Sequence, residues 1–462
     1  MTPAFADPES PSRALHVVSS DALAAWLERQ PHHWQTWLTG QVFEASLGET
    51  RLLPGEDGSI MAAVTGNGTQ KSRSRTRFGL ARAMQSLPAG SWHLEGDLSQ
   101  TQRDEAALGA LLAAYRFDRY RPAKPLSAQA LLKTPDGCDL ARLIAMAEAE
   151  FLTRDLINTP PSDMGPADLE AAFLTLAAKF GAKTDVIRGD DLITQNFPMI
   201  HAVGRASTRV PRILSLRWGT TGPRLTLVGK GVCFDTGGLD IKPSSGMLLM
   251  KKDMGGAATV MGLAHMIMAL NLPVQLRVIV PAVENSISGN AMRPSDILTS
   301  RKGLTVEINN TDAEGRLILA DALAWADEES PDAIISMATL TGSARVAVGP
   351  DLAPFYTDDE DFAAALIAAA PGASDPVWRL PFWDPYESMI EPKIADLDNA
   401  PAGSFAGSIT AALFLRRFVS CPRYLHFDIY GHSPSDAPAR PKGGVGQGAR
   451  ALLGAIETLF KL

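Results

Sequence analysis

From about residue 184 onward, strand-like apolar runs alternate with runs of helical spacing, and this alternation restricts the fold more than any other feature. The expected strands are Arg212 to Trp218, Leu225 to Val228, Val274 to Pro281, Thr305 to Ile308, Ala333 to Met337 and Tyr424 to Ile429. The expected helices are Ala257 to Leu270, Arg316 to Glu328, Ser408 to Val419 and Arg450 to Phe460. Such alternation is typical of a mostly parallel, twisted sheet covered by helices on both faces. The predicted fold class is therefore α/β.

A proline-rich connector, Arg121 to Pro125, interrupts the chain before this region. Each proline biases the residue before it away from helix, so the connector favours a domain boundary. A chain of 462 residues is also too long for one ordinary core. We therefore expect a divergent N-terminal domain at residues 1–125 and a larger domain at residues 126–462. In the first, the basic stretch Thr69 to Arg77 is expected to be a solvated loop.

Charge and cysteine content limit the partners and the compartment. The net charge is −8, without a contiguous block of like charges, which makes nucleic acid or an anionic membrane an unfavourable partner. Three cysteines without a Cys-x-x-Cys pair favour a reducing compartment. The N-terminus has no cationic start followed by an apolar run, and the membrane-like stretch Ala257 to Val283 is interrupted by polar residues. We expect a cytoplasmic protein without membrane contact.

Charged side chains gather in two glycine-containing segments. The first, Val228 to Gly256, carries Lys230, Asp235 and Asp253, and the second, Asn309 to Leu317, carries Asp312, Glu314 and Arg316. Lys230, Asp312 and Thr339 each follow an expected strand. Ligands of parallel sheets bind outside the carboxyl ends of the strands. We therefore expect these groups to lie together at one edge of the sheet.

Four of these groups are carboxylates, and they cannot all stay ionised close together without compensating positive charge. Two divalent ions would supply that charge, since paired metals about 3.5 to 4 Å apart polarise a carbonyl and activate water for hydrolysis. Oxygen ligands suit Mn²⁺ or Mg²⁺, and Zn²⁺ also accepts carboxylates. A lysine joins such a site only as the neutral amine, which a nearby dication favours by depressing its pKa.

Two other motif interpretations fit less well. Gly229-Lys230 suggests a phosphate loop, but Arg224 stands where that motif needs its first glycine, and Gly231 follows the lysine. Asp235-Thr236-Gly237 matches the aspartic protease triplet, but it occurs once, and that chemistry belongs to an all-β fold.

Two segments, Val228 to Asp253 and Asn309 to Leu317, closely resemble the signatures of the leucyl (cytosol) aminopeptidase family of two-metal exopeptidases. Further similarity lies in Met337 to Gly342, Ala406 to Ala412 and His426 to Ile429, so that the resemblance covers roughly residues 130–460. It implies a catalytic domain built on the predicted sheet and a smaller N-terminal α/β domain. It also implies a metal-dependent aminopeptidase that removes N-terminal residues from short peptides.

The resemblance assigns roles residue by residue. Asp235 and Glu314 match carboxylates that bridge both metals, Lys230 and Asp253 match further ligands of one site, and Asp312 matches a ligand of the other. Lys242 matches the residue that polarises the substrate carbonyl and stabilises the oxyanion. Arg316 matches the arginine that holds a bicarbonate ion, which acts as general base. The charged set contains no free histidine for that task, and His426 is expected to pack within or beside the last strand.

The same resemblance implies a pocket for the first side chain. Met250, Thr339 and Gly342 would contact that side chain, while Asn310 and the Leu340 backbone would lie at the scissile bond. Tyr430 departs from the family pattern, which has a small residue there. Its bulk would narrow the pocket, so we expect Tyr430→Ala to broaden the acceptance of large first residues.

The family resemblance also implies a homohexamer, arranged as a dimer of trimers with active sites that face an interior cavity. Two alternatives stay open at this stage. A two-metal phosphoesterase uses similar carboxylates and would hydrolyse p-nitrophenyl phosphate. A non-catalytic scaffold or DNA-binding member would hold no metal at the site.

Overall fold

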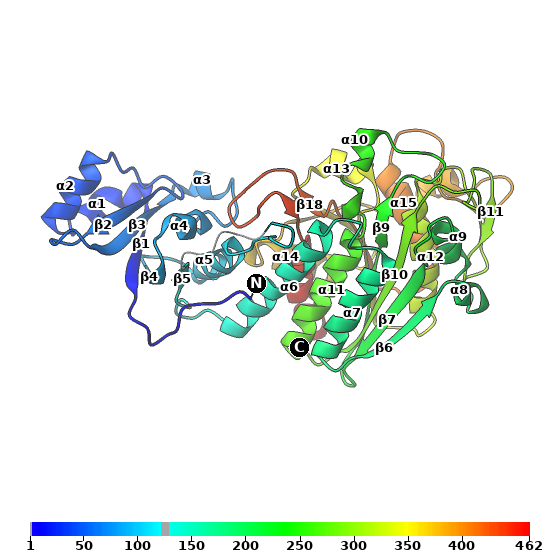
Figure 1. Ribbon diagram of the computed structural model, residues 1–462, viewed down its shortest axis with the longest axis horizontal. Helices are drawn as coiled ribbons and strands as arrows, with labels where there is room; N and C mark the ends of the chain where they lie inside the picture. The colour runs from blue at the N-terminus through cyan, green and yellow to red at the C-terminus, as the bar shows by residue number, and fades with distance from the viewer. Residues whose placement is uncertain (1, 122–128) are drawn as a thin grey trace. The chain divides into compact units, whose positions relative to one another are not determined.

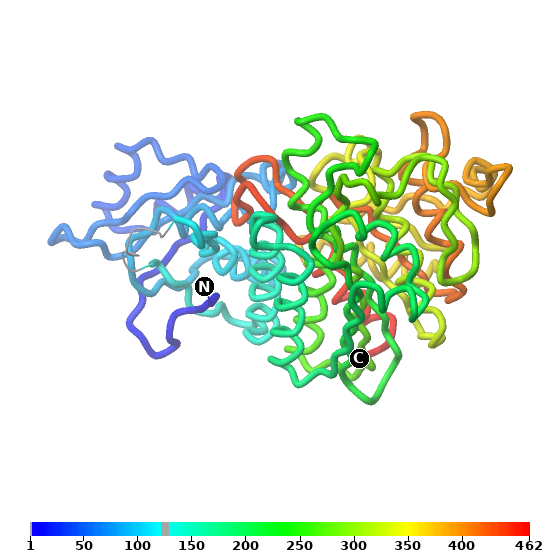
Figure 2. Tube along the Cα trace, turned by 45° about the vertical axis from the view of Figure 1, so that its right-hand side comes forward, coloured from blue at the N-terminus to red at the C-terminus, as the bar shows by residue number. Residues whose placement is uncertain are grey.

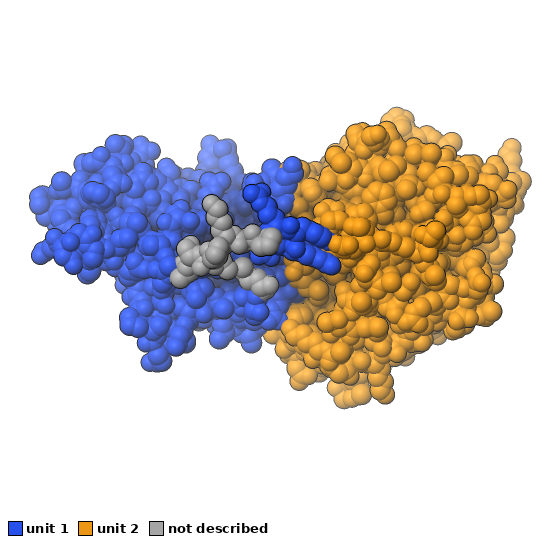
Figure 3. Space-filling view, in the orientation of Figure 1, with its two compact units in different colours: residues 1–151, 435–442 blue, residues 152–434, 443–462 orange. Residues whose placement is uncertain are grey.

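The computed structural model describes residues 2–121 and 129–462. The chain forms two compact units, which Figure 3 distinguishes by colour. The N-terminal unit comprises Met1–Phe151 and Ser435–Lys442, and the C-terminal unit comprises Leu152–Pro434 and Gly443–Leu462. All but the first residue of the expected connector, Arg121 to Pro125, lies outside the described residues, so the boundary placed there stays a prediction.

The C-terminal unit contains a nine-stranded sheet, ordered β15-β14-β17-β13-β8-β10-β7-β6, with β9 paired to β10. Its strands are β6 (Lys183–Arg188), β7 (Arg212–Trp218), β8 (Arg224–Gly229), β9 (Gly231–Asp235), β10 (Gln275–Asn285), β13 (Ala333–Ala338), β14 (Ala353–Tyr356), β15 (Val377–Arg379) and β17 (Tyr424–Asp428). The central strands β17, β13, β8 and β10 run parallel, whereas β7 is antiparallel to both of its neighbours, β10 and β6, and β14 is antiparallel to β17. The predicted α/β class is therefore confirmed.

Helices cover both faces of this sheet (Figure 1). One layer contains α7 (Pro166–Lys179), α11 (Gly255–Ala269) and α16 (Ala449–Phe460), and the other contains α9 (Pro198–Gly204), α12 (Glu314–Asp327) and α15 (Gly407–Arg416). Nearly every side chain of α11 is buried, because the helix lies between the sheet and α16. Helix α16, the last helix of the chain, packs beside α11, and Figures 1 and 2 show the two in different orientations.

The membrane-like stretch predicted to be a buried helix and strand is α11 followed by β10. Across residues 2–121 and 129–462, no helix combines the length and apolar character needed to cross a membrane. The remaining helical segments of the C-terminal unit are α8 (Asp191–Thr194), α10 (Ser244–Met247), η2 (Met250–Lys252), α13 (Gly342–Val348), α14 (Glu360–Gly372) and η3 (Asp384–Ile390). Helix α6 (Leu140–Asn158) begins in the N-terminal unit and ends in the C-terminal unit.

One expected strand belongs to a different sheet. β12 (Thr305–Glu307) pairs with β11 (Ile297–Thr299) and β16 (Leu397–Asp398) in a separate three-stranded sheet. The expectation that Asp312 follows a strand of the large sheet is therefore wrong. The physical reason is that three residues suffice to pair with two short edge strands, and the apolar pattern of so short a run does not specify its partner. A two-stranded sheet, β18 (His432–Ser433) with β19 (Gly443–Gly444), completes the strands described here.

The N-terminal unit contains a five-stranded sheet of order β2-β3-β1-β4-β5. Its strands are β1 (Arg13–Ser19), β2 (Thr50–Pro54), β3 (Ile60–Gly68), β4 (Gly90–Glu95) and β5 (Ala130–Leu132). All neighbours pair in parallel except β2 and β3. The accompanying helical segments are η1 (Ser20–Ala22), α1 (Leu23–Leu27), α2 (His32–Gly40), α3 (Gln70–Arg73), α4 (Ala81–Ser86) and α5 (Gln100–Ala113). This is the smaller α/β domain that the family resemblance implied.

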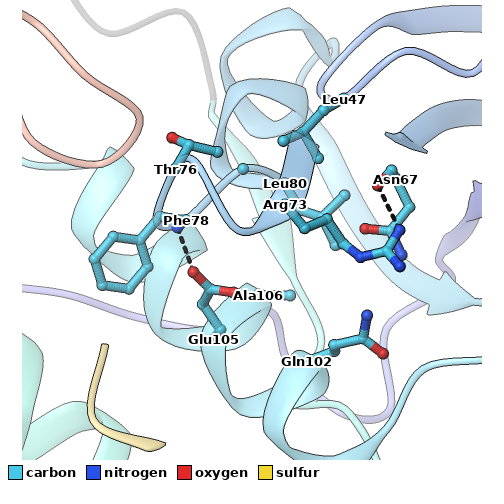
Figure 4. A pocket seen from close by; sticks show the side chains of 10 residues that line it. Leu47, Asn67, Arg73, Thr76, Phe78, Leu80, Gln102, Glu105 and Ala106 are labelled. Atoms are coloured by element: carbon cyan, nitrogen blue, oxygen red, sulfur yellow. Dashed lines mark hydrogen bonds between the residues drawn. The ribbon is translucent and has the colours of Figure 1, made fainter. Parts of the chain in front are cut away.

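The basic stretch Thr69 to Arg77 is more ordered than expected. Thr69 caps α3 through a reciprocal hydrogen-bonded box with Ser72. The guanidinium of Arg73 donates to the carbonyls of Asn67 and Gly68, at 3.0 and 3.1 Å. Figure 4 shows this contact and, across the same small pocket, the Glu105 carboxylate accepting a hydrogen bond from the backbone N–H of Phe78. These charges therefore hold the local backbone in place.

Candidate active site

The predicted charged groups meet at the carboxyl end of the central strands. Lys230 directly follows β8, and Thr339 directly follows the neighbouring strand β13. Asp235 ends β9, and Asp253 follows η2. In Figure 1 the labels of α10 and α13 lie at this same end of the sheet. The ends of parallel strands thus position Lys230, Thr339 and Asp235, while the end of η2 positions Asp253 and the start of α12 positions Glu314.

Lys230 lies at the centre of the first group of contacts. Its Nζ lies 2.8 Å from Asp253 Oδ2 and 2.9 Å from Glu314 Oε1. It also donates to the Thr339 carbonyl at 3.1 Å, and Thr339 Oγ1 donates to Asp253 Oδ1 at 2.8 Å. Burial alone would lower the pKa of Lys230, but the charges of Asp253 and Glu314 outweigh burial and raise it. The protein groups by themselves therefore favour the ammonium form.

Lys242 makes a similar set of contacts, with two other carboxylates of the cluster. Its Nζ lies 2.8 Å from Asp235 Oδ2 and 2.5 Å from Asp312 Oδ1. As with the first lysine, burial opposes the charged form, but Asp235 and Glu314 raise the pKa of Lys242. Asp312, which does not follow a strand of the large sheet, is nevertheless brought into the cluster by the start of α12.

Three carboxylates form the part of the cluster best suited to a metal. Asp235, Asp312 and Glu314 present oxygens that all lie within 4.8 Å of one another. Burial, followed by the charge of Asp235, raises the pKa of Glu314 to about 8 and that of Asp312 to about 6. Among the described residues, Glu314 Oε2 has no hydrogen-bond partner. Crowded, buried oxygens of this kind match the donor set that divalent cations take.

A layer of neutral side chains that sequence reasoning missed orients these carboxylates. Asn285, at the end of β10, donates to Asp235 Oδ1 at 2.8 Å and to the Thr311 carbonyl at 3.0 Å. The Thr311 hydroxyl donates to the Gly237 carbonyl at 2.6 Å. Gly237 has φ +88°, a conformation that favours glycine, and its N–H donates to Asp235 Oδ1 at 2.9 Å. The Thr-Gly-Gly run after Asp235 was the available signal for this turn.

Arg316 and His426 differ in what they offer to the cleft. Arg316 lines the cleft, and its Nε has no hydrogen-bond partner among the residues described. Burial lowers the pKa of Arg316 to about 10, which leaves it cationic at neutral pH. His426 is fully buried in β17, where Nδ1 lies 2.8 Å from Ser336 Oγ, and burial lowers its pKa to about 3. His426 thus packs within the strand, as expected.

The cleft above the charged cluster has a volume of about 610 Å³. It is lined by all six residues expected to contact substrate, namely Met250, Asn310, Thr339, Leu340, Gly342 and Tyr430. The N–H groups of Leu340 and Thr341 donate to Asp428 Oδ1 at 3.1 and 2.9 Å, which fixes the loop after β13. Two cationic residues that sequence reasoning missed, Lys252 and Arg345, also line the cleft.

Gly315 leaves the space that the Lys230 side chain occupies. It lies between Glu314 and Arg316 in the first turn of α12. A Cβ atom at this position would lie 2.5 Å from Lys230 Cε and 2.7 Å from Lys230 Nζ. Because Lys230 is held by two carboxylates and a carbonyl, it has no free direction in which to retreat. The glycine of the Glu-Gly-Arg run is therefore required by packing.

Comparison with known proteins agrees with this geometry. Residues 151–453 match the catalytic domain of the cytosol aminopeptidase family, and residues 14–133 match the M17 aminopeptidase N-terminal domain. A probable cytosol aminopeptidase from Roseiflexus castenholzii is 40% identical over 366 residues, which cover 76% of this chain and 75% of the relative.

Solved structures show the same relationship in three dimensions. The crystal structure of cytosol aminopeptidase from Coxiella burnetii matches with a TM-score of 0.92 and 41% identity, over 98% of each chain. The bottromycin maturation enzyme BotP in complex with Mn matches with a TM-score of 0.88 and 30% identity, over 97% of this chain and 100% of that one. This chain therefore belongs to the cytosol aminopeptidase family and is a metal-dependent aminopeptidase.

Proposed function

We propose that this aminopeptidase holds two divalent ions in the charged cluster and removes the first residue from short peptides in the cytoplasm. The ligands would be Lys230, Asp235, Asp253, Asp312 and Glu314. The observation that supports this most directly is the convergence of Asp235, Asp312 and Glu314, whose oxygens lie within 4.8 Å of one another beneath the cleft. When bound, the ions would polarise the scissile carbonyl and lower the pKa of the attacking water.

Lys230 would enter the ligand set as a neutral amine. The surrounding carboxylates alone favour its ammonium form. A dication between the same carboxylates would reverse the local charge balance and favour loss of the proton. Lys230 would then donate its lone pair where it now forms ion pairs with Asp253 and Glu314.

Lys242 and Arg316 would act on the reacting atoms. The Lys242 ammonium group lies at the cleft wall beside Asp235 and Asp312, where it would stabilise the negative charge that develops on the carbonyl oxygen. Arg316 would hold a small anion, for which we propose bicarbonate, because its Nε is unpartnered among the described residues and it lines the cleft. That anion would take the proton of the attacking water, since His426 is buried away from this task.

Substrate would bind with its free amine toward Asp253 and its first side chain toward Met250, Thr339, Gly342 and Tyr430. Asn310 and the Leu340 backbone would contact the peptide around the scissile bond. The position of all these residues along one cleft supports this orientation. Manganese is the first candidate metal, because the similar BotP structure is described in complex with Mn. Zn²⁺ and Mg²⁺ follow, since both accept carboxylate ligands.

The test is hydrolysis of a set of aminoacyl-p-nitroanilides by purified protein. We expect turnover with Mn²⁺ or Zn²⁺, and weaker turnover with Mg²⁺. Exhaustive chelation should abolish it, and readdition of the ion should restore it. Activity that survives chelation would overturn the metal mechanism. Hydrolysis of p-nitrophenyl phosphate in place of the anilides would support a phosphoesterase instead.

We also propose a homohexamer, as the family resemblance implied, with short peptides as the only substrates that reach the active sites. Light scattering coupled to size-exclusion chromatography measures the assembly directly. A mass of six chains, about 6 × 49.3 kDa, is expected. A monomeric mass together with full activity would contradict this part of the proposal.

A further inference from the structure

Two cations meet at one aromatic ring on the wall of the cleft. Lys252 Nζ lies 5.0 Å from the centroid of the Tyr430 ring, and Arg345 Cζ lies 5.1 Å from the same centroid. Both distances are within the range of cation–π attraction, which fixes the cations relative to the ring. All three side chains line the cleft. The sequence brings them together from η2, α13 and the segment after β17.

Neither cation has a carboxylate partner within ion-pair distance among the described residues. Lys252 is only 6% exposed and makes no side-chain hydrogen bond there. The other two lysines of the cleft, Lys230 and Lys242, are each paired with two carboxylates. A buried ammonium group without a hydrogen-bonded counter-charge is unfavourable, so an anion that enters from the cleft would be stabilised there.

The pair of cations lies beside the corner assigned to the substrate amine. Gly431 follows Tyr430 and packs on Thr339, since a Cβ atom at Gly431 would lie 3.1 Å from Thr339 Cγ2. The Thr339 hydroxyl in turn donates to Asp253 at 2.8 Å. Lys252 is the chain neighbour of Asp253. With the substrate amine at Asp253, as proposed, the group nearest these cations is the one that branches from the carbon atom carrying the amine, namely the first side chain.

We propose that Lys252 and Arg345, positioned by Tyr430, form an anion subsite that selects peptides whose first residue is Asp or Glu. The inference rests on the proposed function, because it uses Asp253 to orient the amine. It also changes the expected role of Tyr430. The ring narrows the pocket and at the same time holds two charges at the position that an acidic side chain reaches.

The test compares substrates of nearly equal shape and different charge. The kcat/KM values for glutamyl- and glutaminyl-p-nitroanilide are measured with the metal-loaded enzyme, together with the aspartyl and asparaginyl pair and the leucyl compound. We expect the acid to be preferred over its amide by at least about tenfold, because charge-assisted hydrogen bonds are about twice as strong as neutral ones. In Lys252→Met and Arg345→Met, this ratio should fall to about one.

Lys251→Met is the matched control. Its Nζ donates to the Asn158 carbonyl at 2.6 Å, and the residue does not line the cleft, so the acid-to-amide ratio should stay at the wild-type value. Because the ratio is taken within each variant, a general loss of activity cancels. Arg345 is exposed, so its replacement removes charge without disturbing the core.

A carboxylate could also belong to the other end of the peptide. Anilides have no terminal carboxylate, so they report only on the side chain. A comparison of kcat/KM for leucylglycine with that for leucylglycine amide measures the effect of the terminal carboxylate. A wild-type acid-to-amide ratio of one or less, with leucyl anilide hydrolysed, would overturn the subsite and leave the aminopeptidase in place. A variant effect confined to the leucylglycine pair would overturn it as well. Absence of hydrolysis for every substrate would remove both proposals together.

Discussion

The active-site cluster of the C-terminal unit and residues 2–121 of the N-terminal unit use charged side chains in opposite ways. In the C-terminal unit, Lys230, Asp235, Asp253 and Glu314 are each at most 3% exposed. Between residues 2 and 121, by contrast, the structure buries no charged side chain, and Thr65 and Asn67 are the buried polar residues. Burial of ions costs several kcal/mol per group before pairing, so stability alone does not explain the first arrangement. The concentrated buried charge of the cluster is therefore better explained by the chemistry proposed for it, whereas partly exposed charge within residues 2–121 supports local backbone geometry.

The largest expected effect comes from removing one carboxylate of the cluster. Glu314→Ala should lower kcat on leucyl-p-nitroanilide by at least about a thousandfold, equivalent to about 4 kcal/mol of lost transition-state stabilisation. The fold should persist, because the change removes a charged group and little core, and circular dichroism would verify this. Glu105→Ala in the N-terminal unit is the control, with kcat expected within about twofold of wild type. Turnover of Glu314→Ala near the wild-type value would contradict a catalytic role for the buried charge of the cluster.

Asp321 tests whether every buried charge serves catalysis, because it is a buried carboxylate of the C-terminal unit that lies outside the cleft. It accepts hydrogen bonds from the backbone N–H groups of Met199, Ile200 and Arg301, at 2.8, 3.3 and 2.8 Å. Asp321→Ala should lower the free energy of unfolding by about 3 to 4 kcal/mol, since it leaves buried donors without acceptors. Urea unfolding measures this loss. A drop of more than tenfold in kcat/KM of the folded variant would show that buried charge outside the cleft also serves catalysis.

A smaller effect, confined to acid, is expected at His426. Burial lowers the pKa of His426 to about 3. Below pH 6.5 its imidazole is therefore protonated in the unfolded chain but stays neutral in the folded protein. The His426 contribution to stability is therefore lost as the pH falls from about 6.5 toward 3, at up to about 1.4 kcal/mol per pH unit. Unfolding of wild type and His426→Gln is compared at several values between pH 8 and pH 4.5.

The difference in unfolding free energy between these two proteins should be constant above pH 7.5 and should move in favour of the variant below pH 6. The acidic groups of the active site titrate in both proteins and cancel in the difference. A difference that stays flat over the whole range would mean that His426 is protonated in the folded protein.

The smallest effect is expected in the N-terminal unit. Glu105→Gln keeps an oxygen that accepts from the Phe78 N–H but removes the negative charge from that bond. The loss of stability should be about 1 kcal/mol, because charge-assisted hydrogen bonds exceed neutral ones by about this amount. Thermal unfolding measures it, and kinetic constants should stay at wild-type values. A large kinetic change would contradict the structural role assigned to charge in this unit.

Prediction from sequence succeeded where local pattern determines local structure. The strand Arg212 to Trp218 has the predicted bounds, since Pro211 and Gly219 punctuate an apolar run. Helix α16 (Ala449–Phe460) begins one residue before the expected Arg450 and ends at the expected Phe460. The separate sheet that contains β12 was not predictable, because its pairing depends on β16, which lies far away in the sequence.

The same limit applies to the active site. The motif segments identified the charged groups of the cluster, because their residue types and spacing carry the chemistry. Asn285 and the pair of Lys252 with Arg345 were missed, since each acts through a contact between distant segments. In the sequence, the two lysines before Asp253 look like an ordinary solvated pair of charges. Only the structure shows that Lys252 is buried. Sequence thus predicted the charged groups that the structure brings together better than the side chains that contact them from distant segments.

Gly315 shows how closely the backbone of α12 approaches the proposed metal ligand Lys230. A single methyl group added at this position would clash with the Lys230 side chain. The change would alter no charge, remove no hydrogen-bond donor and favour helix formation. A chain could therefore keep every acidic and basic residue of the motif, gain helical propensity, and still lose its lysine from the site. We therefore expect a substitution at Gly315, which has no side chain, to affect activity as strongly as a substitution of the charged residue on either side of it.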